Sequence, residues 1–181
     1  MIYSPLEQFN IITLIPLHSG NVYYSFTNSS LYMLLVVGLV LSLFQMVTAE
    51  GGRIVPSRWQ SVVEMIYTFV CDLVEGQVGK AGRAYFPFIF TVFSFILFSN
   101  LIGMVPYSFT VTSHFVVTFG LSISLFIGLT LIGIYTHGLH FLSFFWPSGA
   151  PIAMAPLLVV LEIVSYCFRP LSLGVRLFAN M

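Results

Sequence analysis

The chain has 181 residues, of which 58 % are hydrophobic and only 7 % are charged, and its formal net charge is zero. A soluble domain carries about 25 % charged residues, so this chain cannot cover a globular surface with charge, and its mean hydropathy of +1.00 indicates an integral membrane protein. The absence of a basic run excludes nucleic acid as a partner.

The N-terminal segment, residues 1–30, is mixed in composition and rich in turn residues. It contains no Lys or Arg, whereas a secretory signal needs a positive start and a mitochondrial transit peptide is rich in Arg. We therefore expect a bacterial protein or one made inside the organelle that uses it. Residues 31–48 follow without a charge and are predicted to form the first membrane span.

Residues 50–83 hold four of the six basic and four of the six acidic residues. Within them, apolar residues recur at helical spacings of three and four from Trp59 to Val74, and most charges lie off that stripe. We predict an amphipathic helix over 56–79 that lies on the membrane surface. A helix packed against another protein is the alternative.

From Ala84 to Leu161 there is no Asp, Glu, Lys or Arg. This stretch predicts a second span over 85–105 and a third over 115–136, and a final helix over 151–181 completes an all-α membrane protein with a single domain. The histidines at the helix ends, namely His114, His137 and His140, are interpreted as loop residues rather than proton relays.

The orientation of the chain follows from its basic residues. Arg53, Arg58, Lys80 and Arg83 all flank the first connection, and the other loops contain no Lys or Arg. The positive-inside rule places that connection on the cytoplasmic or matrix side and the N-terminus outside. The final helix then enters the membrane from the inside.

The final helix carries a row of polar residues with spacings of 3, 4, 3, 4 and 4. At about 100° per residue, all six fall on one face, which we call the polar seam. Its members are Glu162, Ser165, Arg169, Ser172, Arg176 and Asn180. Tyr166 is amphipathic and is left outside the seam.

Lipid cannot cover the polar seam, because one charge at the bilayer centre costs from about 2.5 to well over 10 kcal/mol. The seam must therefore face protein, water or a counter-charge. An upright helix would carry Arg176 about 30 Å from Pro156, across the whole hydrocarbon layer. We therefore expect a strongly tilted, membrane-embedded helix, with a modest kink at Pro170.

The segment "LSLGVRLFANM" at 171–181 resembles the core motif of subunit a of F-type ATP synthase, the proton-channel stator subunit. The resemblance extends to "PLEQF" near the start, "VPYSFTVTSHF" at 105–115 and "HFLSFFWPSGAP" at 140–151, and it is nearest to plant and algal mitochondrial forms.

The resemblance implies a subunit of the Fo motor that supplies two offset proton half-channels beside a ring of c subunits, each with one essential carboxylate. Arg176 matches the essential arginine of the family, which acts in proton translocation. Glu162 matches the glutamate of the inside half-channel, and Asn180 matches the asparagine beside the arginine. The partners implied are the c-ring, the peripheral stalk, the other Fo subunits, membrane lipid and protons.

Each of the remaining candidates has more than one interpretation. Ser165 and Ser172 line the proton path or bond back to their own helix. Asn100 meets outside-channel water or makes a helix–helix hydrogen bond. Arg169 pairs with Glu162, with lipid phosphate or with the ring.

No cofactor or metal is expected. The cysteines, Cys71 and Cys167, have no CxxC spacing and are interpreted as small buried hydrophobes. The resemblance also implies a further helix that returns antiparallel to the last one, and we expect a second polypeptide to carry it, with a truncated or a defective fragment as alternatives.

The sequence suggests three functions that can be compared. The first is the proton-translocating stator subunit of the mitochondrial inner membrane, which is not itself catalytic and neither binds nor hydrolyses ATP. The second is a non-conducting structural or assembly fragment of the same complex. The third, an unrelated secondary transporter, predicts inverted repeats that the sequence does not contain.

Overall fold

The computed structural model describes residues 7, 9–20, 22–49, 51, 54–138, 141, 145 and 155–180. The chain is mostly helical, which confirms that part of the predicted fold class. It divides into two compact units, Met1–Val111 and Thr112–Met181, and each is described by itself.

Four helical segments in the described part are long and apolar enough to cross a membrane. They are Asn28–Ala49, Gly82–Gly103, Phe115–His137 and Leu157–Ala179. The amphipathic helix α2 (Arg58–Val78) is not one of them, as its charges predict. The four segments fall on the three predicted spans and the predicted final helix.

The N-terminal segment contains short strands, so the expectation of an all-α chain was too narrow. Strands β1 (Thr13–Ile15) and β4 (Phe26–Thr27) pair antiparallel, and β2 (His18–Ser19) pairs with β3 (Val22–Tyr23). Gly20, which has φ +61°, lies in the turn between β2 and β3, where glycine adopts the left-handed conformation without steric cost. Strands of two or three residues are too short to give a periodic sequence pattern, which is why they were not predicted.

Side chains at the start of α1 (Asn28–Ala49) join this segment to the helix. The Asn28 amide donates to the Asn10 carbonyl (3.0 Å), and its oxygen accepts from the Ile12 amide (3.3 Å). The Ser30 hydroxyl accepts from the Thr27 amide at 3.1 Å and so satisfies a backbone donor at the helix start. The strands are thus anchored to the first helix.

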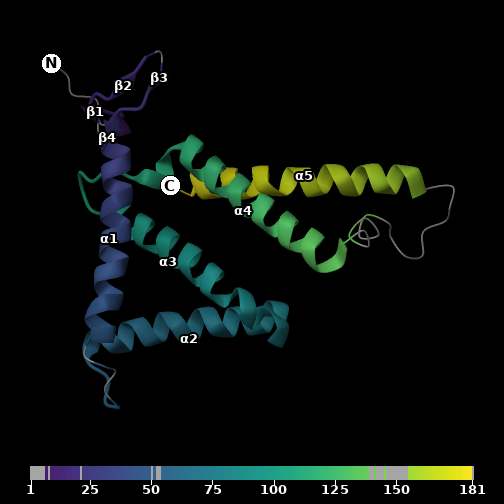
Figure 1. Cartoon of the computed structure of the whole chain (residues 1–181), viewed down its shortest axis with the longest axis horizontal. Coiled ribbons are helices and arrows are strands. Elements are labelled where there is room, and N and C mark those ends of the chain that lie inside the picture. The colour runs from purple at the N-terminus through teal and green to yellow at the C-terminus, as the bar shows by residue number, and fades with distance from the viewer. Residues whose placement is uncertain are drawn as a thin grey trace. The chain divides into compact units, whose positions relative to one another are not determined.

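Aromatic contacts join the three helices of the first unit. Figure 1 shows α2 crossing the lower end of α1, and α3 (Phe86–Gly103) running back toward α1. The Tyr67 ring on α2 packs on Phe86 of α3 with centroids 4.8 Å apart, and Phe44 of α1 lies 5.5 Å from Phe90. An Arg83–Glu75 ion pair (2.6 Å), exposed to solvent, links α2 to the 3-10 turn Lys80–Tyr85.

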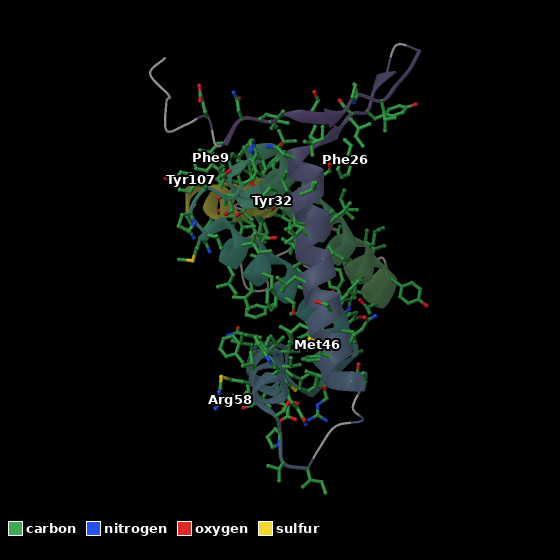
Figure 2. All side chains as sticks on the ribbon, turned by 90° about the vertical axis from the view of Figure 1, so that its left-hand side faces the viewer. Phe9, Phe26, Tyr32, Met46, Arg58 and Tyr107 are labelled. Atoms are coloured by element: carbon green, nitrogen blue, oxygen red, sulfur yellow. The ribbon has the colours of Figure 1, made fainter. Side chains whose placement is uncertain are left out.

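The connection between α1 and α2 and the loop after α3 lie at opposite ends of α1. Tyr32 and Tyr107 are at one end, and Met46 and Arg58 are at the other (Figure 2). In the connection after α3, the Ser108 hydroxyl donates to the Ile102 carbonyl at 2.6 Å, and the Phe109 ring packs on Tyr32 at 5.8 Å. The basic connection and the loop after α3 therefore face opposite sides of any membrane that α1 crosses.

The second unit is an antiparallel pair of helices, α4 (Phe115–His137) and α5 (Ala155–Ala179). Their contacts run in opposite order along the chain: Phe115 meets Phe178, and Phe126 meets Tyr166. The α5 helix continues through Pro170, and the Ser122 hydroxyl donates to the Pro170 carbonyl. His140, Trp146 and most of the connection between these helices lie outside the described residues.

Small residues allow α4 and α5 to approach closely. Gly174 is buried, and a Cβ atom built there would lie 3.3 Å from the Phe119 Cα and 3.5 Å from the Ser122 Cβ. Small residues at the contact are the usual means of close helix packing in membranes. This crossing fixes how α5 is rotated about its own axis.

Replacing Gly174 with leucine should therefore destabilise the helix pair by about 1–3 kcal/mol through overpacking. Gly120→Leu on α4 is the matched control, because nothing in the structure lies within 4 Å of a Cβ atom there. The amount and thermal stability of the assembled, detergent-solubilised protein would be compared. Equal losses for both variants would contradict the close crossing.

Candidate functional site: a polar seam on helix α5

The packing of α5 against α4 leaves the polar seam uncovered within its unit. Tyr166, Pro170 and Gly174 form the side of α5 that meets α4. Arg169 and Arg176 lie about 100° and about 120° around the axis from Pro170, and both are exposed. With α5 rotated in this way, the two arginines point away from α4.

The middle of the seam is hollowed. Six residues line an open groove, and four of them belong to the seam. They are Ser165, Phe168, Arg169, Ser172, Leu173 and Arg176. The structure thus brings both arginines and both serines of the predicted site together on one groove.

The two serines face the groove rather than their own helix. In the described part of the chain, neither the Ser165 nor the Ser172 hydroxyl bonds back to a carbonyl of α5, unlike Thr130 of α4, which donates to the Phe126 carbonyl at 2.7 Å. Their oxygens are therefore available to water or to a partner in the groove. Among the described residues, the structure thus does not show the second interpretation of these serines, a bond back to their own helix.

The ends of the seam lie outside the groove. Glu162 is half-buried near the start of α5, 14 residues before Arg176, which corresponds to about 21 Å along the axis. Asn180 is exposed just past the helix end, and its backbone amide donates to the Arg176 carbonyl at 3.2 Å. A carboxylate and a carboxamide therefore lie one at each end of a groove whose charges are both positive.

Arg169 is held by an aromatic ring instead of by Glu162. Its guanidinium carbon lies 5.5 Å from the centroid of the Tyr166 ring, a cation–π distance. Among the described residues, the structure pairs Arg83 with Glu75 and does not pair Arg169 with Glu162. Tyr166 lies outside the predicted seam, although its place three residues before Arg169 puts the two side chains on neighbouring turns.

The other predicted candidates are not among the residues that line this groove. Asn100 is half-buried on α3, in the first unit. Its backbone carbonyl accepts from the backbone amide of Met104 at 3.1 Å. His114 precedes α4 and His137 ends it, so both flank a helix as expected. In the described residues no three His, Cys, Asp or Glu side chains form a metal site.

Both cysteines are free, but the expectation that they are buried was wrong. Cys71 is half-buried, with its sulfur 3.8 Å from Glu75 Oε1, and Cys167 is exposed on α5. Cys167 lies about 60° around the helix from Pro170, where it borders the apolar surface turned away from α4. An apolar residue that lipid would cover counts as exposed in the protein alone.

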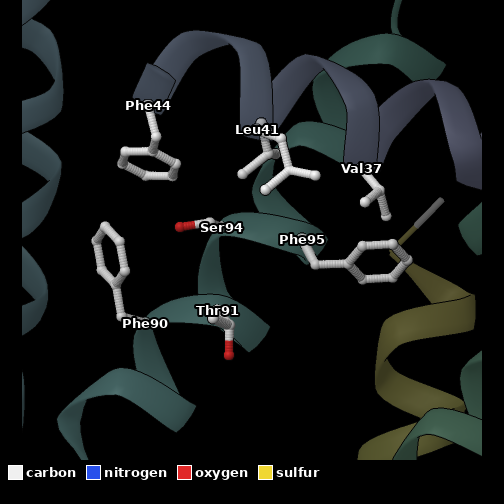
Figure 3. Close-up of a pocket in the computed structure, with 8 residues that line it drawn as sticks. Val37, Leu41, Phe44, Phe90, Thr91, Ser94 and Phe95 are labelled. Carbon is white, nitrogen blue, oxygen red and sulfur yellow. The ribbon is translucent and has the colours of Figure 1, made fainter. Parts of the chain in front are cut away.

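The first unit contains a hollow of a different kind. Figure 3 shows a space between α1 and α3 lined by Val37, Leu41, Phe44, Phe90 and Phe95, with the Ser94 and Thr91 hydroxyls as its polar groups. The Ser94 oxygen is buried and has no hydrogen-bond partner in the described residues. Since it contains no ionisable group, this hollow offers no proton-carrying chemistry.

The comparisons with known proteins agree with the resemblance seen in the sequence. The family model described as "ATP synthase A chain" matches residues 30–181. The chain is 62 % identical to ATP synthase subunit a of Marchantia polymorpha, covering all of this chain and 73 % of that protein. It is 59 % identical to subunit a of Oenothera berteroana (99 % and 66 % covered) and 57 % identical to subunit a-2 of Arabidopsis thaliana (98 % and 52 % covered). The chain thus spans between about half and three quarters of the length of these curated relatives.

Cysteine labelling tests whether the seam is the wet face of α5. In a background with Cys71 and Cys167 replaced by serine, Ser165→Cys and Ser172→Cys should react about tenfold faster with a water-soluble thiol reagent than Leu171→Cys, since apolar surroundings disfavour the reactive thiolate. Leu171 is exposed about 120° around α5 from Ser165 and about 100° from Ser172, and it serves as the matched control. Similar labelling rates in membrane vesicles would contradict a hydrated seam.

Proposed function

Since the chain belongs to the ATP synthase A chain family, we propose that it is the stator subunit of the Fo motor that provides part of two proton half-channels. In this role it couples proton translocation to rotary ATP synthesis, and it neither binds nor hydrolyses ATP itself. Its partners are the c-ring, the other Fo subunits with the peripheral stalk, and membrane lipid.

The exposed polar seam is the observation that carries this proposal. A helix long enough to cross a membrane holds two arginines on a face that its neighbour α4 does not cover. Since lipid cannot solvate these charges, a partner with negative charge is the natural occupant of that face. A purely structural fragment would gain nothing from keeping such a costly surface, so the non-conducting alternative is not favoured.

Arg176 acts as a fixed cation opposite the ring carboxylates. An arginine stays charged at every relevant pH, whereas a desolvated lysine can lose its proton. The guanidinium favours the ionised form of a nearby carboxylate, and it repels a proton that would pass straight between the half-channels. A proton must then leave the carboxylate on one side and travel around with the ring.

The remaining seam residues divide between the two half-channels. Glu162 relays protons in the inside half-channel, and the Ser165 and Ser172 hydroxyls line its path toward Arg176. Asn180 lies beyond Arg176 and belongs to the outside half-channel. Asn100 is proposed for the same outside channel, and Arg169 is a supporting cation between Glu162 and Arg176.

We place the chain in the mitochondrial inner membrane as one multi-pass domain with its N-terminus on the intermembrane-space side. The plant relatives and the apolar helices support the location, and the basic residues around α2 support the orientation. In this arrangement α2 lies on the matrix surface. The α5 helix is strongly tilted, so that Arg176 lies near the middle of the bilayer.

Arg176→Ala in the assembled complex should stop ATP synthesis, because the barrier between the half-channels and the attraction for the ring carboxylate are lost together. The passive proton leak should rise, while assembly is retained. Proton-driven ATP synthesis and pH-gradient decay in inner-membrane vesicles would measure both effects. Arg176→Lys, which keeps a cation but lacks the guanidinium, is the matched variant, and normal coupled synthesis in Arg176→Ala would refute the assigned role.

A further inference from the structure

We propose that Tyr166, tethered to Thr130 of α4, is a positioning residue that fixes the guanidinium of Arg169 within the polar seam. The inference rests on the proposed function, since it concerns a cation of the same pathway. Tyr166 is thus a partner of Arg169 in addition to the three that the sequence suggested. The inference also gives a role to two residues outside the predicted site.

The tether has a defined direction. The Tyr166 and Thr130 hydroxyl oxygens are 2.9 Å apart, and Thr130 donates its single proton to the Phe126 carbonyl at 2.7 Å. Because a hydroxyl has only one proton to donate, Tyr166 must be the donor in the bond to Thr130. The chain of bonds therefore runs from α5 to a backbone carbonyl of α4 and holds the phenol oxygen in place.

Aromatic contacts hold the ring itself. The Phe126 ring lies 4.8 Å from it in a tilted arrangement, and Phe145 lies 5.5 Å away with the planes at 87°. Aromatic contacts of this kind stabilise a ring beyond the effect of the area that they bury. The Tyr166 ring is thus held at its oxygen and on its sides by contacts that do not involve Arg169.

Arg169 uses the ring that these contacts fix. Its guanidinium carbon is 5.5 Å from the ring centroid. A free arginine side chain has considerable rotamer freedom, and a cation–π contact with a fixed ring restricts that freedom. A rigid ring therefore gives Arg169 one preferred place beside the groove.

The place of Tyr166 along the helix explains why this matters for the pathway. Tyr166 lies one turn after Glu162 and just under one turn before Arg169, so it stands between the two charges. Since opposite charges attract near a protein surface, an unrestrained guanidinium would be drawn to the carboxylate. A guanidinium held on the ring stays apart from the Glu162 carboxylate, which then remains unpaired for its role in the inside half-channel.

A double-mutant cycle in the assembled complex tests this role. We expect Tyr166→Leu to lower the rate of proton-driven ATP synthesis about tenfold. Tyr166→Phe and Thr130→Val should each lower it about threefold, and no further when combined, because both remove the same hydrogen bond. Phe115→Leu is the packing control, since its ring contacts Phe119 and Phe178 and not Tyr166.

The decisive measurement is made in a background in which Arg169 is replaced by glutamine. If Tyr166 acts through Arg169, Tyr166→Leu adds little to the defect of Arg169→Gln, and the amount of assembled complex is unchanged. If the two defects multiply, or if Tyr166→Leu acts only by reducing assembly, the positioning role is wrong. Arg176→Ala, measured in parallel, separates the outcomes: coupled synthesis in that variant would reject the proposed function itself.

Discussion

A guanidinium that can neither lose its charge nor be solvated by acyl chains is the constraint on which the second unit depends. The cost of placing such a group in hydrocarbon runs from about 2.5 to well over 10 kcal/mol, which is a large fraction of the stability of a typical domain. Two of these groups lie on α5, and both are exposed within the chain. Within a membrane, the second unit is therefore stable only when a polar or negatively charged partner covers that face.

The contact between α4 and α5 determines where that face points. Gly174 lets the two backbones approach, and Ser122 bonds to a carbonyl of the same turn, at Pro170. Pro170 has no amide hydrogen, so the Tyr166 carbonyl loses its usual helical donor there. The helix nevertheless continues. A larger residue at position 174 would change the rotation of α5 and with it the direction of both arginines, so residues without charge control the placement of the charges.

Helix α2 shows how one amphipathic face can serve two neighbours. Part of its apolar face, including Val70 and Val74, is buried within the first unit. Other apolar residues of this helix remain exposed, with Trp59 at 62 % and Met65 at 68 % exposure. This exposed surface suits both interpretations drawn from the sequence, a helix on the membrane surface and a helix packed against another protein. One side packs on the chain's own helices, and the other is suited to an interfacial position.

The helices and their polar and apolar faces were predictable from the sequence, and the contacts between side chains of different helices were not. The four apolar helices and the seam follow from composition and from spacings of three and four, because these depend only on helix geometry. Tyr166 is different, because its three-residue spacing from Arg169 is visible in the sequence while its bond to Thr130 spans 36 positions. Only the antiparallel register of α4 and α5 brings that hydroxyl to the ring. A cation–π contact becomes a positioning device only when the ring is itself fixed, so the tertiary contact, not the local motif, decides what Arg169 does.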